Sequence, residues 1–145
     1  MNTSWTDAES AYFAGIIDGE GCFCLHDQGT HRFSCQLQIG NTDLRLLEWI
    51  RSRFGGSVRL ERRHAPGHKP MWRWVAHHTE LDAILAAILP FLIVKKNQAE
   101  LFVAYRSTLA ARINTKRSTA KTPDHIKSKR ADIHSQLAML NRRGA

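Results

Sequence analysis

The sequence FAGIIDGEG at positions 13–21 places two carboxylates, Asp18 and Glu20, among three glycines. It stands where a helix is expected to end, near Gly19. The C-terminal end of a helix carries partial negative charge, and Mg²⁺ prefers carboxylate and carbonyl oxygens as ligands. We therefore expect a divalent cation at this helix end, bound by Glu20 and the carbonyl oxygen of Gly19. For Asp18 two roles stay open, a metal ligand or a group that orients a packed helix.

A helix is expected to lead into this segment, because Thr6 and Glu9 have the spacing of a capping box. At about 100° per residue, small residues fall on one helix face and large apolar residues on the other. The small face comprises Ala11, Ala14, Gly15 and Asp18, and the apolar face comprises Phe13, Ile16 and Ile17. Small residues allow another backbone to approach closely. We expect the small face to pair with the same helix of a second chain.

The period of the apolar residues changes from helical to strand-like after this helix, and turn residues separate the strand-like segments. Two antiparallel hairpins are predicted, with a helix between them and further helices after them. The last helix is expected to begin at Thr122 and Pro123, after a basic connector. The expected order is a hairpin (22–28 and 32–39), a helix (43–54), a second hairpin (57–63 and 71–76) and helices from 79, broken at Pro90, over 96–112 and from 122.

The polar sides of these strands would form one open sheet face, while Trp72 and Trp74 point to the core. A two-stranded ribbon fits the major groove of DNA, where glutamine suits adenine and arginine suits guanine. The alternative is a sheet face that only contacts water, as most polar strand faces do. The candidate DNA-binding residues are Cys24, His26, Gln28, Arg32, Ser34, Gln36, Gln38, Arg59, Glu61, Arg63 and Arg73.

The charge balance favours a polyanionic partner. Lys and Arg number 21 against 13 Asp and Glu, a formal net charge of +8 on 145 residues, and basic domains of this kind commonly bind nucleic acid. The alternative is a basic protein without such a partner. The chain has no apolar run of about 20 residues, and MNTSWTDAES lacks the regions of a secretion signal. We expect an intracellular protein, in the cytoplasm or an organellar matrix, without membrane contact.

Three cysteines, Cys22, Cys24 and Cys35, are an odd number that does not suggest a disulfide framework. Cys22, Cys24 and His26 have alternate positions that suggest zinc. Alternate residues on a strand lie about 6.6–6.8 Å apart, too far to converge on an ion with ligands at about 2.0–2.3 Å. The strand geometry therefore argues against a zinc site, and against a small metal or redox protein that uses the three cysteines.

The segment FAGIIDGEG resembles the LAGLIDADG motif of homing endonucleases, with Phe13 in place of the leading leucine. The similarity continues through IGNTDLRLLEWIRSRFGG (39–56) and LPFLIVKKNQAEL (89–101). It covers most of the chain and is loosest over about the last thirty residues. We read 1–145 as one domain of this kind, in which about 114–145 form the basic connector and the C-terminal helix.

The resemblance implies an α+β fold of αββαββα order, with a saddle-shaped antiparallel sheet, helices on one face and an added C-terminal helix. It implies hydrolysis of both strands of a long pseudo-palindromic double-stranded DNA site with Mg²⁺ or Mn²⁺. Family members with a single motif are homodimers, and this chain has one motif. The runner-up is a non-catalytic nucleic-acid binder on the same fold, such as an intron splicing helper or a regulator.

The resemblance also assigns catalytic residues. Glu20 stands where the family normally has aspartate, which puts activity rather than fold in question. Lys95 matches the family's active-site lysine, and its alternative is a surface lysine beside Lys96. Asn41 matches a polar position that holds solvent near the metal, and Gln98 matches a position that is expected to be structural.

Overall fold

The computed structural model describes residues 4–61, 67, 69–77, 79–110 and 122–142. The predicted order of helix, hairpin, helix, hairpin and further helices is confirmed. The elements are α1 (Asp7–Glu20), β1 (Gly21–Asp27), β2 (Phe33–Asn41), α2 (Leu44–Phe54), β3 (Ser57–Leu60), β4 (Trp72–His77), α3 (Thr79–Ile88), the 3-10 turn η1 (Leu89–Phe91), α4 (Lys96–Ala110) and α5 (Asp124–Arg142).

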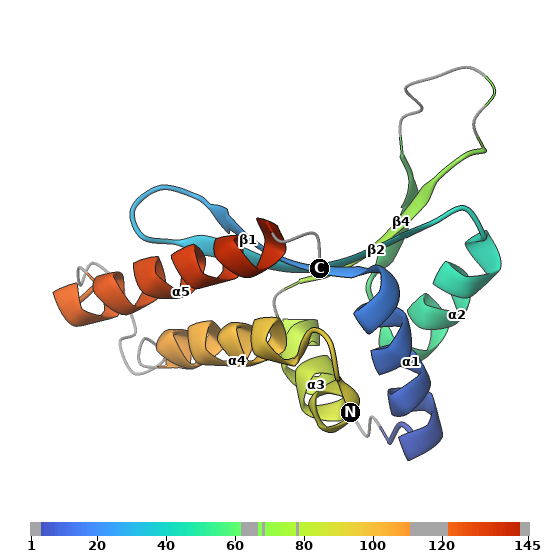
Figure 1. The fold of residues 1–145 in the computed structure, drawn as a ribbon, viewed down its shortest axis with the longest axis horizontal. Helices are drawn as coiled ribbons and strands as arrows, with labels where there is room; N and C mark the ends of the chain where they lie inside the picture. The colour runs from blue at the N-terminus through green and yellow to red at the C-terminus, as the bar shows by residue number, and fades with distance from the viewer. Residues whose placement is uncertain (1–3, 62–66, 68, 78, 111–121, 143–145) are drawn as a thin grey trace.

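The four strands form one antiparallel sheet in the order β1-β2-β4-β3. The two hairpins meet where β2 pairs with β4, for example Ile39 with Trp74. All helices lie on one side of the sheet (Figure 1), and the other face carries the polar side chains. The predicted α+β fold with helices on one face of an antiparallel sheet is therefore confirmed.

Local signals explain where the helices begin. The hydroxyl of Thr6 accepts a hydrogen bond from the backbone N–H of Glu9, and the Glu9 carboxylate accepts one from the backbone N–H of Thr6, which is the predicted capping box. Asp43 caps α2 by accepting from the backbone N–H of Arg45. The helix α5 begins at Asp124, one residue later than expected. Within the described residues, none of the helices has the length and hydropathy of a membrane-spanning segment.

The predicted faces of α1 need correction. Ala14, expected on the small open face, is 0% exposed and belongs to the core together with Phe13 and Ile17. Ile16, expected on the buried face, is only half-buried. The reason is that α1 packs against α3 and η1 as well as against the sheet, so a wider arc of the helix is covered. The open face instead carries Ala11, Tyr12, Gly15 and Gly19.

Arg130 connects α5 to the rest of the fold. Its side chain is 0% exposed, and its guanidinium donates to the Thr108 hydroxyl at 2.9 Å and to the carbonyl of His31 at 3.1 Å. It also lies 5.6 Å from the centre of the Tyr105 ring. This single cation joins α4, α5 and the turn between β1 and β2. The C-terminal helix, where the sequence resemblance is loosest, is thus an integral part of the fold.

The turn before β3 gives a prediction about stability. Gly55 and Gly56 have φ of 82° and 84°, and the carbonyl of Gly55 accepts from the Trp74 indole at 2.8 Å. A Cβ at Gly56 would lie 2.6 Å from the Trp74 Nε1 and 2.8 Å from the Val75 carbonyl, whereas at Gly55 its nearest neighbour is the Glu80 carboxylate at 3.7 Å. A residue with a Cβ would therefore meet the same backbone strain at both positions, but it would find less space at Gly56 than at Gly55.

We expect Gly55→Ala to lower the free energy of unfolding by about 1–3 kcal/mol, because only backbone strain is added. Gly56→Ala should add about 1–3 kcal/mol to that loss, because overpacking against Trp74 accompanies the strain. Urea denaturation of both variants measures the difference. Equal losses would show that the close approach of Gly56 to Trp74 contributes nothing.

Candidate metal and nucleic-acid site

Asp18 holds the start of α4 at the end of α1. Its carboxylate accepts backbone hydrogen bonds from Ile93 at 2.9 Å, Val94 at 3.1 Å and Lys95 at 2.9 Å. These N–H groups form the entry to α4, where an anion is favoured by the helix dipole. Both carboxylate oxygens are thus engaged within the chain. Asp18 therefore connects two segments of the chain, and its place in a dimer interface stays a prediction.

Lys95 completes the connection in the opposite direction. Its side chain is 8% exposed, and its ammonium group donates to the carbonyls of Ile17 at 3.2 Å, Asp18 at 3.3 Å and Gly21 at 2.6 Å. A cation is favoured at the C-terminus of a helix, where carbonyl groups have no partner in the helix. The alternative of a surface lysine is therefore excluded for Lys95, whereas Lys96 is exposed. Gln98, expected to be structural, is buried.

Glu20 and Asn41 lie together at the start of the sheet. The Asn41 amide donates to the Glu20 carboxylate at 2.7 Å, and the Asn41 carbonyl oxygen accepts from the backbone N–H of Asp43 at 2.8 Å. Because a backbone N–H can only donate, it fixes which way the Asn41 amide faces. Asn41 therefore orients Glu20 and is itself held by the N-cap residue of α2. Of the sequence-predicted catalytic residues, Glu20, Asn41 and Lys95 all lie around the last turn of α1.

The donor atoms at this helix end fit a hard cation. Glu20 is exposed, and the backbone of Gly19 lies in the last turn of α1. Mg²⁺ is commonly bound by one or two carboxylates together with water and substrate phosphates. No cluster of three His, Cys, Asp or Glu side chains that could hold a metal ion occurs among the described residues.

A chain of hydrogen bonds crosses the open sheet face. Arg73 on β4 forms a salt bridge with Glu61, with its Nε 2.6 Å from the carboxylate, and donates to the side-chain oxygen of Gln38 at 2.8 Å. The Gln38 amide in turn donates to the side-chain oxygen of Gln36 at 2.7 Å. Side-chain exposure is 27% for Arg73 and 32% for Glu61. These side chains are ordered by one another while still facing solvent.

The other candidate DNA-binding residues that lie on described strands follow the predicted alternation, whereas Gln28 and Arg32, expected on strands, lie between β1 and β2. Side chains at alternate positions of β1 and β2 point away from the helices, and their neighbours are buried. Arg63 lies outside the described residues. The exposed members are His26, Gln28, Arg32 and Arg59, and the half-buried members are Cys24 and Ser34.

Two thiols meet on the same face. The sulfur atoms of Cys22 and Cys24 are 3.4 Å apart, so the spacing argument that separated alternate residues does not hold for these two side chains. The hydrogen bond from Cys24, with smaller contributions from the positive charges of Lys95 and Arg73, lowers the pKa of Cys22 to about 6 against the effect of burial. Burial raises the pKa of Cys35 to about 12. Cys35 is in the core, so the three cysteines do not form one site.

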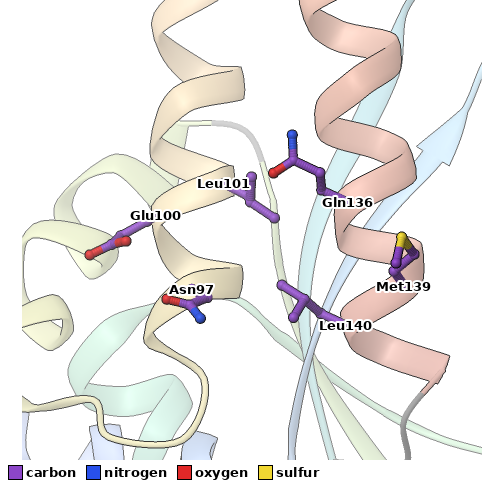
Figure 2. Close-up of a pocket in the computed structure, with 6 residues that line it drawn as sticks. All are labelled: Asn97, Glu100, Leu101, Gln136, Met139 and Leu140. Atoms are coloured by element: carbon purple, nitrogen blue, oxygen red, sulfur yellow. The ribbon is translucent and has the colours of Figure 1, made fainter.

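Hollows lie beside α1 and between α4 and α5. One, of about 560 Å³, runs along the open face of α1 and is lined by Ala11, Tyr12, Gly15, Ile16, Gly19, Glu20 and Leu46. The other, of about 440 Å³, lies between α4 and α5, with Leu101 and Leu140 between the two helices and Asn97, Glu100, Gln136 and Met139 around them (Figure 2). The first contains Glu20 and three small residues of α1, whereas the second contains none of the predicted site residues.

Comparison with known proteins gives short sequence matches and long structural ones. No family model matches the chain. The intron-encoded RNA maturase bI4 of Saccharomyces cerevisiae is 39% identical over 49 residues, which are 34% of this chain and 7% of the maturase. The chain therefore spans only a small part of the length of this curated relative.

Solved structures match nearly the whole fold. The homing endonuclease I-CvuI, solved in complex with its target in the presence of calcium, has a TM-score of 0.69 and 22% identity over 92% of this chain and 82% of that chain. The LAGLIDADG homing endonuclease I-GzeII, solved in complex with a DNA target, has a TM-score of 0.66 and 18% identity over 86% of this chain and 43% of that chain. With FAGIIDGEG on α1, beside the sheet, this chain has the LAGLIDADG homing-endonuclease fold.

Proposed function

We propose that this protein is a metal-dependent, site-specific endonuclease that cuts both strands of a long pseudo-palindromic double-stranded DNA site as a homodimer. The observation that carries the proposal is the position of Glu20, held by Asn41 at the end of a helix that the buried Lys95 also caps. The open polar sheet face begins at this point, so a duplex on the sheet would bring phosphates to Glu20. The DNA complexes of proteins with the same fold support the substrate class.

Mg²⁺, or Mn²⁺ in its place, would be held by Glu20 and the carbonyl of Gly19. A bound divalent ion stabilises negative charge on the attacking and leaving oxygens of a phosphodiester. Asn41 keeps the Glu20 carboxylate in one orientation. Lys95 fixes the carbonyls at the end of α1 and places a positive charge beside the site.

The homodimer rests on the open face of α1. Ala11, Gly15 and Gly19 follow one another along this face, and the hollow over them is lined mostly by apolar atoms. A second α1 could approach closely there. Pairing α1 with its copy would bring two Glu20 carboxylates together, one for each DNA strand. This arrangement would complete a site for which one chain supplies a single carboxylate.

A second candidate function is assistance in RNA splicing without cleavage of DNA. It is favoured by the match to an intron-encoded RNA maturase, which is 39% identical over 49 residues. The presence of glutamate where the family normally has aspartate also leaves cleavage to be tested. The oriented Glu20 and buried Lys95 favour the endonuclease.

Replacing Glu20 tests the metal assignment. Glu20→Gln keeps the shape of the side chain and its contact with Asn41 but removes the charge that attracts Mg²⁺. We expect Glu20→Gln to lose cleavage of a plasmid that carries a site selected by the wild type from a DNA library. Binding of that site in the absence of metal should be kept. Glu100→Gln, an exposed position on α4, should cleave like the wild type. Double-strand cleavage by Glu20→Gln would refute the assignment, and a wild type that binds but never cuts would favour the splicing helper.

Replacing Gly15 tests the homodimer. A Cβ at Gly15 meets nothing within 4 Å in the chain, so Gly15→Leu is accommodated in one protomer and should even favour the helix by about 1 kcal/mol. In a dimer paired through α1 it clashes with the partner. We expect sedimentation to show monomers for Gly15→Leu and dimers for the wild type and for Ala131→Leu, an exposed change on α5. A dimeric Gly15→Leu would place the interface elsewhere.

Lys95 and Lys96 form a matched pair of variants. Lys95→Met removes a donor that three carbonyls share, of which that of Ile17 still accepts from the backbone N–H of Gly21, and it removes the charge beside Glu20. We expect the cleavage rate to fall by about 10²-fold or more and the free energy of unfolding to fall by about 1–3 kcal/mol. Lys96→Met, which changes an exposed neighbour, should alter neither quantity. A cleavage rate of Lys95→Met equal to that of the wild type would limit Lys95 to a structural role.

A further inference from the structure

The chain of hydrogen bonds from Glu61 to Gln36 has a direction that its chemistry fixes. We call these four side chains, Glu61, Arg73, Gln38 and Gln36, the relay. Arginine can only donate hydrogen bonds, so the Gln38 oxygen faces Arg73 and the Gln38 amide nitrogen faces away from it. That nitrogen requires an acceptor, and it meets the Gln36 oxygen at 2.7 Å. The orientation of both amides therefore follows from Arg73.

Glu61 anchors the other end of the relay. Its carboxylate accepts from the Nε and Nη2 of Arg73, while the Nη1 of Arg73 donates to Gln38. A guanidinium has five N–H donors, of which these contacts use three, so two donors stay available, one on each Nη. Guanine presents two acceptors, O6 and N7, in the major groove. Arg73 thus keeps as many unused donors as guanine has acceptors in the groove.

The relay also constrains the expected adenine contacts. A glutamine that recognises adenine donates to N7 and accepts from the N6 amine. In Gln38 the oxygen already accepts from Arg73 and the nitrogen already donates to Gln36, although each keeps one lone pair or one N–H. In Gln36 the oxygen is turned toward Gln38, so both N–H groups of its amide have no partner in the relay. The orientation that the relay sets therefore presents donors from Gln36 first.

We propose that the relay makes Arg73 and Gln36 present hydrogen-bond donors to the major groove, with Gln38 as the link that sets their polarity. Each half-site then carries guanine opposite Arg73. Opposite Gln36 it carries a base that presents an acceptor in the groove to the amide N–H, and guanine is the base expected to be preferred most. This inference rests on the proposed function, since it needs a duplex on the sheet. Beyond the proposed function, it specifies which bases the DNA site contains and which side chain determines them.

Gln38→Glu tests the proposed polarity. A carboxylate at position 38 still accepts from Arg73 but no longer donates to Gln36, so the Gln36 amide turns and offers its oxygen to the groove. We expect the base preference at the Gln36 position to change to cytosine or adenine, which present an N4 or N6 amine. The guanine opposite Arg73 should be kept. The expected change in preference at the altered position is about tenfold.

The experiment selects sites from a randomised double-stranded DNA library with the full chain, without divalent metal, and compares the enriched half-sites. Gln136→Glu adds the same charge at an exposed position on α5, outside the relay and outside the candidate DNA-binding residues, and it should leave every base preference unchanged. Gln38→Met removes the link without adding charge, so Gln36 becomes free to rotate. It should then accept adenine as well as guanine at the same position.

The outcomes distinguish a failure of the relay from a failure of the proposed function. Enrichment of a defined site by the wild type, with the same preferences in Gln38→Glu and Gln38→Met, would overturn the relay and leave the proposed function standing. Arg73→Ala should weaken the base preference at the position that Arg73 contacts. If the wild type does not prefer guanine at that position, the relay is also overturned. Failure of the wild type to enrich any duplex would overturn both. A change confined to one position per half-site in Gln38→Glu would support the relay.

Discussion

The reciprocal contact between Asp18 and Lys95 is the constraint on which the rest of the site depends. The carboxylate of one residue binds three backbone N–H groups around the other, and the ammonium of the second binds three backbone carbonyls around the first. Each charge is stabilised by a helix end of opposite partial charge. Residues 77 positions apart are joined in this way, and the end of α1, the start of β1 and the start of α4 are fixed as one body.

This arrangement determines which acid can meet a substrate. The Asp18 carboxylate accepts hydrogen bonds from the backbone of residues 93–95. Glu20, two positions later, is exposed, and its carboxylate accepts a hydrogen bond from Asn41. One helix end therefore offers one carboxylate. Under the proposed function, hydrolysis of both strands would need that carboxylate twice, so the proposal joins the open face of α1, with its small residues, to the chemistry of Glu20.

The sequence predicted the elements whose causes are local. The capping box of Thr6 and Glu9, the alternation along β1 and β2 and the interruption at Pro90 all act within a few residues. It failed where distant segments decide. Ala14 is buried because α3 and η1 pack against α1, and Asp18 is engaged by a segment far along the chain. Arg130 has no local signal, since its partners lie on α4 and in the turn between β1 and β2. The 3.4 Å contact of Cys22 and Cys24 depends on side-chain rotation, which residue spacing does not contain.

The relay on the open face shows why intramolecular partners can favour recognition. Long side chains such as arginine and glutamine lose conformational entropy when they are ordered against a ligand. In Arg73, Gln38 and Gln36 much of that ordering is already present, because Glu61 fixes the guanidinium and the guanidinium fixes the amides. Under the proposed function, an anchoring carboxylate on this face would oppose phosphate binding by its charge, but it leaves one donor on each Nη of Arg73 unused. Glu61, a candidate DNA-binding residue by sequence, would then act through Arg73, and the selectivity of the face would depend on contacts made before DNA arrives.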